Sequence, residues 1–394
     1  MSANIVLGVT GGIAAYKSLQ VASMLTKLDH NVYTIMTEAA TEFIKPITFH
    51  SLTHLPVESK LFSTTTSEVK HIGLADKADL FLIAPATANF IAKAAAGIAD
   101  DLLTTVILAT QAPIMIAPSM NVHMFENPVV QRNMLALEEL GYKIITPEAG
   151  YLACGYTGQG RLPDPQRLVE EIKKELSQKD LQDKKVLITA GPTREAIDPV
   201  RFLTNYSSGK MGYALAKAAS YRGAEVKLVS GPTELECPLG VDLIKIESAA
   251  DMKKEVFKEA DTADIIIMAA AVADYRPQVY STQKIKKQSR DLSLDLERTA
   301  DILTELGKKK KTSQLLIGFA AESENLLENA QQKLRKKQAD YIIANEISDK
   351  NTAFGSDKNQ VSILSEEGST KLPLMEKDKL ADKIFNYIID AERK

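Results

Sequence analysis

The sequence predicts an α/β protein built from two doubly wound, three-layer domains, each with a mainly parallel sheet between two layers of helices. Short apolar runs typical of buried strands alternate with longer stretches of helical periodicity along the whole chain. The length of 394 residues exceeds what one ordinary core needs and suits two. Alternation and length together favour two similar domains in series.

The strands are predicted from apolar runs of four to seven residues. In the first half they lie near residues 5–9, 32–36, 80–84, 113–117 and 143–146. In the second half they lie near residues 186–190, 225–230, 264–270, 314–319, 341–344 and 361–364. Helical patterns fill the gaps, beginning with the stretch from Ala14 to Leu28. The two halves look alike around 78–84 and 263–269, which common α/β architecture explains more simply than duplication does.

The boundary between the domains is predicted from the charged stretch 165–185. Four apolar residues fall on one side of it at helical spacing: Leu168, Val169, Ile172 and Leu176. This stretch should therefore pack as a helix on a domain before a polar linker follows. We expect one domain at residues 1–182 and the other at 183–394.

Composition restricts the possible partners. The chain is 45% hydrophobic and 25% charged with a formal net charge of −3, which argues against a dedicated nucleic-acid-binding protein. Two cysteines, Cys154 and Cys237, imply no disulfide framework and fit a reducing compartment. No basic signal region and no apolar run near the roughly 18–20 residues of a membrane span is present. We expect a cytoplasmic protein that acts on small molecules, without a membrane or a nucleic acid.

The turn after the first strand predicts a phosphate site. Gly11, Gly12 and Ile13 let backbone N–H groups approach an anion at the start of the next helix. The pattern differs from the G-x-G-x-x-G dinucleotide fingerprint, and Thr37 offers a hydroxyl where a ribose-binding acid would be expected. A phosphomonoester such as that of FMN fits better than NAD, although a tight structural turn explains the loop nearly as well.

Other candidate residues follow later strands of the first half, where open α/β sheets bind ligands. Thr87 and Asn89 follow the third strand and Asn121 the fourth, with small residues around them that leave room for a flat ring. The glycine-rich stretch 150–161 reads as a mobile flap around Cys154, either a reagent or a small apolar filler. His71 opens a short helical segment, where the macrodipole favours the neutral imidazole that a base requires.

These residues together resemble the flavin-dependent cysteine decarboxylases, most closely phosphopantothenoylcysteine decarboxylase. The resemblance covers nearly all of residues 4–165 and departs at Phe125, where tryptophan is typical. It implies a flavodoxin-like domain in which FMN oxidises the substrate thiol to a thioaldehyde, so that carbon dioxide can leave. By this resemblance His71 is the acid/base, Asn121 binds the substrate carboxylate and Cys154 donates the final proton.

The second half contains a different set of strand-end motifs. The loop after its first strand leads to the segment 205–212, a P-loop-like sequence that fails the P-loop test because Thr204 stands where the first glycine is required. Its serines are predicted to cap the helix 210–222. Asp274 follows the third strand, and the run 284–287 contains three lysines, which fit either a solvated face or a triphosphate site.

This set closely resembles phosphopantothenate–cysteine ligase over about residues 184–390. The resemblance implies a nucleotide-binding, Rossmann-like domain that uses CTP with Mg²⁺, and it makes Asp274 the candidate ligand of the metal ion. It assigns the CTP site to Met268, Ala269, Ala270, Asp274, Lys284, Ala300, Asp301, Ile302, Leu303, Phe319, Lys333 and Lys337. The usual Asn-Pro-Asp-Ile is Thr-Ala-Asp-Ile at 299–302, a departure in the triphosphate loop. Lys284 is implied in acyl-cytidylate formation and Asn205 in polarising the activated carbonyl.

Both resemblances in one chain imply a bifunctional enzyme of coenzyme A biosynthesis. It would ligate cysteine to 4′-phosphopantothenate with CTP and then decarboxylate the product to 4′-phosphopantetheine. Related flavin domains form trimers with FMN at the subunit interface and related ligase domains form dimers, so a homo-oligomer, up to a dodecamer, is expected. The alternative is a flavoprotein-like regulatory binding subunit with a vestigial site, against which His71, Asn121 and Cys154 argue. A generic NAD-dependent oxidoreductase lacks its fingerprint.

Overall fold

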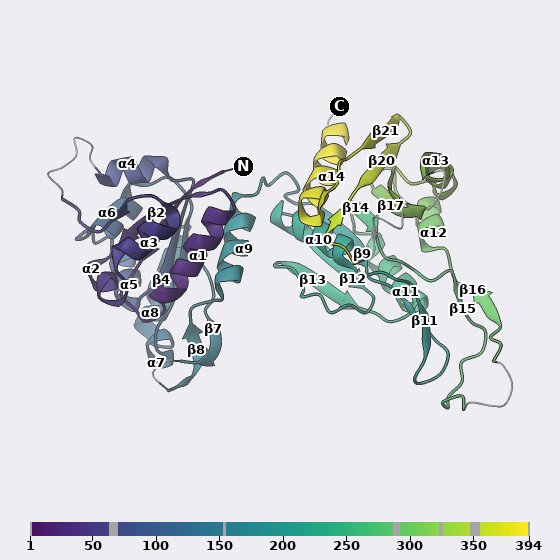
Figure 1. Ribbon diagram of the computed structural model, residues 1–394, viewed down its shortest axis with the longest axis horizontal. Coiled ribbons are helices and arrows are strands. Elements are labelled where there is room, and N and C mark those ends of the chain that lie inside the picture. Colours follow the sequence, from purple (N-terminus) through teal and green to yellow (C-terminus); the bar gives the residue numbers. More distant parts are fainter. Residues whose placement is uncertain are drawn as a thin grey trace. The chain divides into compact units, whose positions relative to one another are not determined.

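The computed structural model describes residues 2–62, 70–152, 155–286, 292–322, 326–346 and 355–392. The chain forms two compact units, Met1–Leu176 and Ser177–Lys394 (Figure 1). The boundary predicted near residue 182 lies in the turn between the helix that ends at Leu176 and the next strand. Among the described residues, no helix combines the length and the apolar character needed to cross a membrane.

The first unit is organised around a six-stranded parallel sheet with strand order β3-β2-β1-β4-β5-β6. Its strands are β1 (Asn4–Val9), β2 (Asn31–Met36), β3 (Val57–Glu58), β4 (Leu80–Ala86), β5 (Ile114–Pro118), β6 (Lys143–Ile144), β7 (Glu148–Tyr151) and β8 (Thr157–Arg161). Without the two-residue β3, this is the flavodoxin-type order, which confirms the predicted fold class. The direction of winding reverses between β1 and β4, and ligand sites form at such a point.

Helices cover both faces of this sheet. They are α1 (Ala15–Lys27), α2 (Glu38–Phe43), α3 (Pro46–Thr53), α4 (Lys70–Lys77), α5 (Ala88–Ala96), α6 (Leu102–Ala109), α7 (Val122–Phe125), α8 (Pro128–Glu139) and α9 (Pro165–Leu176). Successive β1 residues alternate between the layers: Leu7 packs with α1, α3 and α9, while Val6 packs with α5, α6 and α8. Helix α9 lies beside α1 (Figure 1) and buries Leu168, Val169 and Ile172, so the predicted packing of this segment is confirmed.

The second unit contains an eight-stranded sheet with order β13-β12-β9-β14-β17-β18-β20-β21. Its strands are β9 (Lys185–Ala190), β10 (Arg194–Ala196), β11 (Phe202–Thr204), β12 (Glu225–Ser230), β13 (Val241–Lys245), β14 (Ile265–Met268), β15 (Tyr275–Pro277), β16 (Leu296–Arg298), β17 (Leu315–Glu322), β18 (Tyr341–Glu346), β19 (Lys358–Asn359), β20 (Val361–Ser365), β21 (Gly368–Lys371) and β22 (Met375–Glu376). The six strands from β13 to β18 are parallel, and β20 and β21 extend the sheet antiparallel. Winding reverses between β9 and β14.

This sheet is also enclosed by helices on both faces. They are α10 (Lys210–Tyr221), α11 (Ala249–Ala260), α12 (Ile302–Lys309), α13 (Leu326–Lys337) and α14 (Lys377–Glu392). Ile188 of β9 packs in the layer of α10 and α14, whereas Leu187 packs in the layer of α11, α12 and α13. The unit is therefore a second three-layer domain, as the sequence predicts.

Two antiparallel hairpins project from the strand ends of the second unit. β10 pairs with β11 and β15 with β16, each over three residue pairs. Another hairpin, β7 with β8, forms in the first unit where the sequence predicts a flap. Strands this short carry too few residues to show a period of two, so sequence patterning does not reveal them.

Candidate functional sites

A cavity of about 410 Å³ opens at the switch point of the first unit. Its walls come from the loop after β1, the start of α5, the loop after β5 and the end of the β7–β8 hairpin. The lining residues are Gly11, Gly12, Ile13, Ala14, Tyr16, Lys17, Thr87, Ala88, Ser119, Met120, Asn121, Met124, Tyr151, Leu152, Gly160, Arg161 and Leu162. The structure thus brings together five residues predicted from the sequence: Gly11, Gly12, Ile13, Thr87 and Asn121.

The loop after β1 is held against β4 by Thr10. The Thr10 hydroxyl donates to the Pro85 carbonyl at 2.7 Å and accepts from the Thr87 backbone N–H at 3.0 Å. In the described part of the chain, the N–H groups of Gly11, Gly12 and Ile13 have no hydrogen-bond acceptor. Unsatisfied N–H groups before a helix attract an anion. The loop therefore fits a phosphomonoester.

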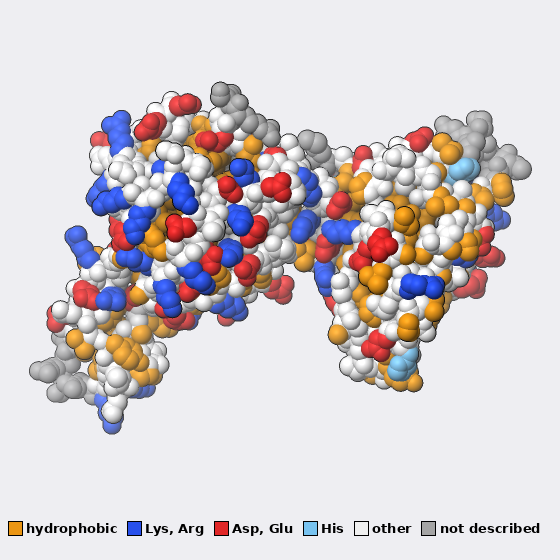
Figure 2. Space-filling view, turned by 180° about the vertical axis from the view of Figure 1, so that it is seen from behind, with side chains coloured by type: hydrophobic (Ala, Val, Ile, Leu, Met, Phe, Trp, Pro, Cys, Tyr) orange, Lys and Arg blue, Asp and Glu red, His pale blue; other side chains and the backbone are white. Residues whose placement is uncertain are grey.

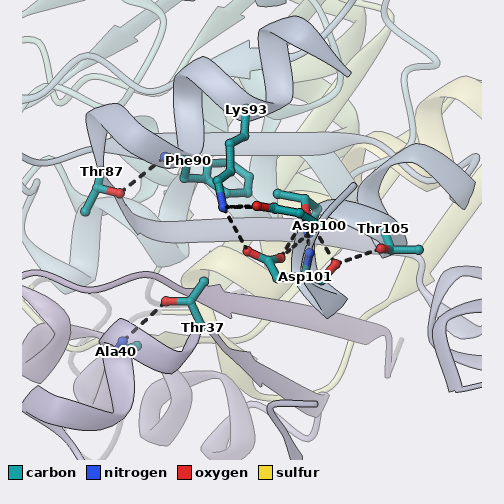
Figure 3. Close-up of polar contacts among 9 residues, drawn as sticks. Thr37, Ala40, Thr87, Phe90, Lys93, Asp100, Asp101 and Thr105 are labelled. Carbon is teal, nitrogen blue, oxygen red and sulfur yellow. Dashed lines mark hydrogen bonds and ion pairs between the residues drawn. The ribbon is translucent and has the colours of Figure 1, made fainter. Parts of the chain in front are cut away.

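Thr87 and Thr37 act mainly as helix caps (Figure 3). The Thr87 hydroxyl accepts from the Phe90 N–H at 3.4 Å at the start of α5, and the Thr37 hydroxyl accepts from the Ala40 N–H at 3.3 Å at the start of α2. Thr87 also lines the cavity, whereas Thr37 and the exposed Asn89 are not among its lining residues. The sequence signal at Thr37 is explained locally by its N-cap geometry.

Asn121 faces the cavity from the N-cap of α7. Its Oδ1 accepts from the His123 N–H at 2.8 Å. The β7–β8 hairpin is fastened to the same loop, because the Met120 N–H donates to the Gly160 carbonyl at 2.9 Å. A Cβ at Gly160 would lie 2.4 Å from the Met120 carbonyl oxygen, so the two segments approach as closely as glycine permits. The base of the predicted flap is therefore rigidly joined to the Asn121 loop.

Two predicted catalytic residues are not seen at this cavity. His71 lies on α4, is half-buried and is not a lining residue. Figure 1 shows α4 at the end of the unit opposite to α7 and the β7–β8 hairpin. Cys154 lies outside the described residues. Phe125, where the resemblance expects tryptophan, is buried among residues of the α5–α8 layer, so its departure concerns packing.

Lys17 is a charged residue of the cavity that sequence reasoning missed. It is only 7% exposed, and its Nζ donates to the Leu162 carbonyl at 2.9 Å. Burial, with a smaller effect of Arg161, lowers the pKa of Lys17, while Glu148 and Asp164 oppose the shift. In the sequence, Lys17 is one polar residue of an amphipathic helix, and nothing in that pattern predicts its contact with a residue 145 positions away.

At the switch point of the second unit, the loops after β9 and β14 are joined by their backbones. The Ala271 N–H donates to the Gly191 carbonyl at 3.0 Å, and the Thr193 N–H donates to the Ala271 carbonyl at 3.2 Å. Asn205 reaches the same point, since its Nδ2 donates to the Ala271 carbonyl at 3.1 Å. The structure therefore places Asn205 beside the predicted nucleotide segment 268–270.

Within this segment, side chains and backbone have different surroundings. Met268 is buried, while Ala269 and Ala270 are partly buried and pack on opposite layers. The Ala270 N–H donates to the Thr189 hydroxyl at 3.1 Å. A nucleotide bound here would contact the backbone and the methyl groups rather than long polar side chains.

The serines before α10 do not cap that helix, contrary to the sequence prediction. The N-cap is Gly209, with φ of 76° and no side-chain hydrogen bond, while the Ser207 hydroxyl accepts only from the Gly209 N–H at 3.4 Å. A Cβ at Gly209 would lie 2.7 Å from Thr233 Cγ2, and a left-handed φ disfavours any other residue. Lys210 pairs with Asp357 at 2.6 Å. The left-handed conformation of Gly209 therefore depends on a contact with a residue distant in the sequence.

The predicted triphosphate loop and the α13 lysines meet at the start of α12. Asp301 caps α12 by accepting from the Thr304 N–H at 3.0 Å, and it forms an ion pair with Lys337. Burial alone would raise the pKa of Asp301, but the hydrogen bonds from Lys337 and Thr304 outweigh it and hold that pKa below its ordinary value. Lys333 Nζ donates to the Phe319 carbonyl at 3.2 Å.

The side chains of Ile302 and Leu303 face the core, which leaves only their backbones for a ligand at the start of α12. The side chain of Ile302 is buried in the core of the second unit, and that of Leu303 packs against the same core. Ala300 precedes the cap of α12. The three residues therefore offer backbone groups to an anion at a helix N-terminus.

Lys284 and Asn205 lie at opposite ends of the β10–β11 hairpin within one chain. Asn205 follows Thr204 at the root, whereas Ile285, next to Lys284, is hydrogen-bonded to the turn 197–201 at the tip. A hairpin of three residue pairs is about 10 Å long. The structure thus does not bring these two predicted catalytic residues together in one copy of the chain.

Asp274 is exposed, and its carbonyl accepts from the Thr299 N–H at 3.0 Å. Within the described residues, no group of three or more His, Cys, Asp or Glu side chains could hold a metal ion. A magnesium ion that arrives with a nucleotide keeps several waters and needs only one or two carboxylates. Asp274 fits that limited role.

Comparison with known proteins divides the chain in a similar way. Residues 1–177 match the Flavoprotein family, and residues 181–391 match the family described as DNA/pantothenate metabolism flavoprotein C-terminal domain. The coenzyme A biosynthesis bifunctional protein CoaBC of Bacillus subtilis (strain 168) is 48% identical over 391 residues, which is 98% of this chain and 96% of that protein.

Solved structures also resemble parts of the chain. The C-terminal domain of a coenzyme A biosynthesis bifunctional protein CoaBC is 46% identical and covers 55% of this chain and 99% of its own, with a TM-score of 0.48. The FMN-dependent cysteine decarboxylase SpaF is 34% identical and covers 42% of this chain and 93% of its own, with a TM-score of 0.38.

Proposed function

From the premise that the chain belongs to the family of coenzyme A biosynthesis bifunctional proteins, we propose that its two units catalyse successive steps of that synthesis. The protein is a bifunctional enzyme, a phosphopantothenate–cysteine ligase and a phosphopantothenoylcysteine decarboxylase. We assign the ligase to residues 183–394 and the decarboxylase to residues 1–182. The ligase joins cysteine to 4′-phosphopantothenate with CTP, and the decarboxylase converts the product to 4′-phosphopantetheine.

FMN is the proposed cofactor of the first unit. The observation that carries this proposal is the set of N–H groups without acceptors at Gly11, Gly12 and Ile13, directly beside the cavity. These groups would hold the phosphate, and Thr87, which lines the cavity, would hydrogen-bond the ring system. Thr37 and Asn89 do not line the cavity, so they would contact FMN only where it extends beyond the cavity walls. Bound FMN supplies the two-electron acceptor that makes loss of carbon dioxide from an amino acid carboxylate feasible.

Asn121 is proposed to bind the carboxylate that leaves as carbon dioxide. Its Oδ1 is held by the His123 N–H and its side chain lines the cavity, so a carboxylate bound in the cavity would lie beside its amide group. Cys154 is proposed to deliver the last proton from the flap, whose base is fastened to Met120. In a Cys154→Ser variant we expect the decarboxylated enethiolate to accumulate, and normal turnover would contradict this role.

His71 is proposed to act at the cavity of a neighbouring copy. The side chain does not line the cavity of its own unit. Ile13 and Tyr151 at the cavity rim are 61% and 73% exposed, which favours cover by another protein surface. A trimer of the flavin units, with FMN at the subunit interface, would satisfy both observations. A His71→Asn protein mixed with an Asn121→Asp protein should then recover activity when trimers are allowed to reassemble.

The second unit is proposed to bind CTP at its switch point. The cytidine would lie along the backbone of 268–270, near Asp274 and Phe319, and the triphosphate at the start of α12. Lys333 and Lys337 already converge on this place, and Lys337 neutralises Asp301 there. Ala300, Ile302 and Leu303 would contribute N–H groups. A magnesium ion would arrive with the triphosphate, with Asp274 as its protein contact.

In this proposal, ligation proceeds in two steps. A carboxylate oxygen of 4′-phosphopantothenate attacks the α-phosphorus of CTP, the bond to the β-phosphate breaks, and pyrophosphate leaves. Lys284 stabilises the negative charge that develops in this step. The amine of cysteine then attacks the acyl carbon, the carbon–oxygen bond to CMP breaks, and the amine loses a proton. Asn205, held by Ala271, polarises the acyl carbonyl.

Variants of these two residues separate the steps. We expect Lys284→Gln to abolish cytidylate formation, because the developing charge loses its cation. We expect Asn205→Asp to form the cytidylate and let it accumulate. Pyrophosphate release and cysteine-dependent CMP release, measured separately, report each step, and normal rates in both variants would refute the assignment.

The second unit is proposed to dimerise through its projecting hairpins. The β15–β16 arm carries exposed apolar side chains, among them Tyr275 and Leu296, and β11 adds Phe202. Figure 2 shows apolar side chains gathered on this arm, at the lower left. Trimers of one unit and dimers of the other would close into a dodecamer. We propose a cytoplasmic homo-oligomer that needs neither membrane nor nucleic acid.

The overall test supplies purified, FMN-loaded protein with 4′-phosphopantothenate, cysteine, CTP and Mg²⁺ and identifies products by mass spectrometry. Formation of 4′-phosphopantetheine, CMP and carbon dioxide supports both assignments. Accumulation of phosphopantothenoylcysteine alone would leave only the ligase. Formation of neither product would favour a flavoprotein-like regulatory binding subunit with a vestigial site.

A further inference from the structure

Asp198, in the turn of the β10–β11 hairpin, accepts five hydrogen bonds, more than any other carboxylate whose bonds are seen in the described part of the second unit. Its side chain is fully buried. Oδ1 accepts the N–H groups of Val200 and Arg201, each at 2.9 Å. Oδ2 accepts Arg201 Nε at 3.0 Å, Arg201 Nη2 at 2.5 Å and the Ile285 N–H at 3.0 Å. Four of these five bonds shape the turn or hold its arginine in place, and the fifth reaches a distant segment.

That distant segment is the lysine loop, by which we mean residues 281–286. Arg201 Nη2 also donates to the Ile285 carbonyl at 2.8 Å, so the pair of side chains binds both the N–H and the C=O of one peptide residue. A second tie joins the Ser281 N–H to the Ile197 carbonyl at 3.0 Å. The loop is thus fixed to the hairpin tip at both of its ends, although 87 positions separate Asp198 from Ile285.

Because the backbone is held at Ile285, the Cα of the neighbouring Lys284 is held in place as well. Lys284 is exposed and lies in a loop that, in its described residues 281–286, forms neither helix nor strand. Without the two bonds at Ile285, the loop would be held to the hairpin only at Ser281, three residues before Lys284. A flexible lysine on a flexible loop loses the pre-organisation that electrostatic catalysis requires.

The Asp198 carboxylate is suited to this task because it stays charged. The hydrogen bond from Arg201 lowers the pKa of Asp198 well below its ordinary value, and the N–H groups of Ile285, Val200 and Arg201 act in the same direction against the effect of burial. The carboxylate therefore keeps the charge that binds Arg201 and the Ile285 N–H at neutral pH.

We propose that Asp198, together with Arg201, is a positioning residue that holds the lysine loop so that Lys284 reaches the activated carboxyl group. The proposal rests on the proposed function of Lys284 and deepens it. Asp198 itself touches no substrate atom in this proposal. It acts through one backbone residue and only for the step that uses Lys284.

The test compares Asp198→Asn with Asp180→Asn in the full-length, FMN-loaded protein. Asp180 is a control because its buried carboxylate also accepts two hydrogen bonds from one arginine, Arg222, and makes no contact with the lysine loop in the described structure. We expect Asp198→Asn to slow single-turnover cytidylate formation by about 10- to 100-fold, since a misplacement of about 1 Å has such effects. Asp180→Asn should leave that rate unchanged where the protein is folded.

Two further measurements separate positioning from general damage. Hydrogen exchange at the Ile285 amide should become fast in Asp198→Asn and stay slow in Asp180→Asn. Arg201→Lys keeps a positive charge beside Asp198 but loses the fork that also reaches Ile285, so it should show the same loss in smaller measure. Equal exchange at Ile285 in the parent and Asp198→Asn proteins would overturn the proposal.

The double variant Asp198→Asn/Lys284→Gln decides whether the effect passes through Lys284. Lys284→Gln should abolish cytidylate formation on the timescale of turnover, so the comparison uses the residual cytidylate formed during long single-turnover incubations. Residues that act as a unit are not additive, so the residual rate of the double variant should be within about twofold of that of Lys284→Gln. Multiplying effects would refute the positioning role. Full cytidylate formation in Lys284→Gln alone would instead refute the proposed function of Lys284, which keeps the two failures distinct.

Discussion

Gly11 offers a direct test of how the phosphate loop is built. A Cβ at this position would lie 2.5 Å from the Ala39 Cβ and 2.9 Å from the Ala39 carbonyl carbon, at the start of α2. Carbon atoms without a bond between them prefer about 3.5–4.0 Å, so Gly11→Ala requires a movement of about 1 Å. The neighbouring atoms belong to a backbone and a methyl group, and neither can rotate away. The loop after β1 must therefore move relative to α2.

The cost of that movement should appear in flavin binding. Overpacking by one methyl group costs about 1–3 kcal/mol, and the displaced loop must return to its original place to bind the phosphate. At about 1.4 kcal/mol per factor of ten, the FMN dissociation constant should rise by roughly 5- to 140-fold. The measurement is fluorescence titration of the apo-protein with FMN, accompanied by thermal unfolding of the apo-protein.

Gly12→Ala is the control within the same loop. A Cβ at Gly12 would have Thr87 Cγ2 at 3.8 Å as its nearest neighbour, an ordinary contact. The apo-protein should therefore unfold at the parent temperature with this substitution and at a lower temperature with Gly11→Ala. Parent-like FMN affinity in Gly11→Ala would show that the loop does not bind the phosphate in the described geometry.

The remaining predictions concern charged side chains. Lys17→Met should speed hydrogen exchange in β8. The free energy of unfolding should change by only about 1 kcal/mol, because the loss of a hydrogen bond is offset by the removal of a buried ammonium group. Unchanged exchange in β8 would contradict this prediction. Arg222→Met leaves the Asp180 carboxylate buried without its partner, so the calorimetric transition of the second unit should lose about 3–5 kcal/mol, or roughly 6–20 °C. Because Lys337 lowers the pKa of Asp301, this pair stabilises the fold above the unfolded carboxyl pKa and ceases to do so as pH falls through the folded one. When the free energy of unfolding is measured at a series of pH values, Lys337→Met should reduce its fall in the acidic range.

Many features of the fold could be predicted because they are written in local patterns. The run Ile5–Val9 must be a buried strand, and the 3.6-residue period of 165–176 must be a helix that packs on its own unit. Gly11, Gly12 and Asn121 could be chosen as site residues for a related reason. Parallel strands bring their carboxyl ends to one edge, so loops after different strands meet even when their order in the sheet is unknown.

Other features could not be found in this way. Gly209 caps α10 where serines were expected, because Thr233 and the left-handed turn leave space for nothing else. His71 was chosen correctly as a helix-start residue, but its distance from the cavity of its own unit depends on where α4 packs. Short hairpins such as β10–β11 have no periodicity to detect.

The elements and their order can be predicted from the amino-acid sequence, because periodicity records which face of each element is buried. Which distant groups touch is set by packing: Lys17 with Leu162 across 145 positions, and Asp198 with Ile285 across 87. The physical reason is that a buried charge requires partners from whatever backbone the packing brings near. Local patterning holds no information about that choice, which the register of the sheets and the path of the loops set together.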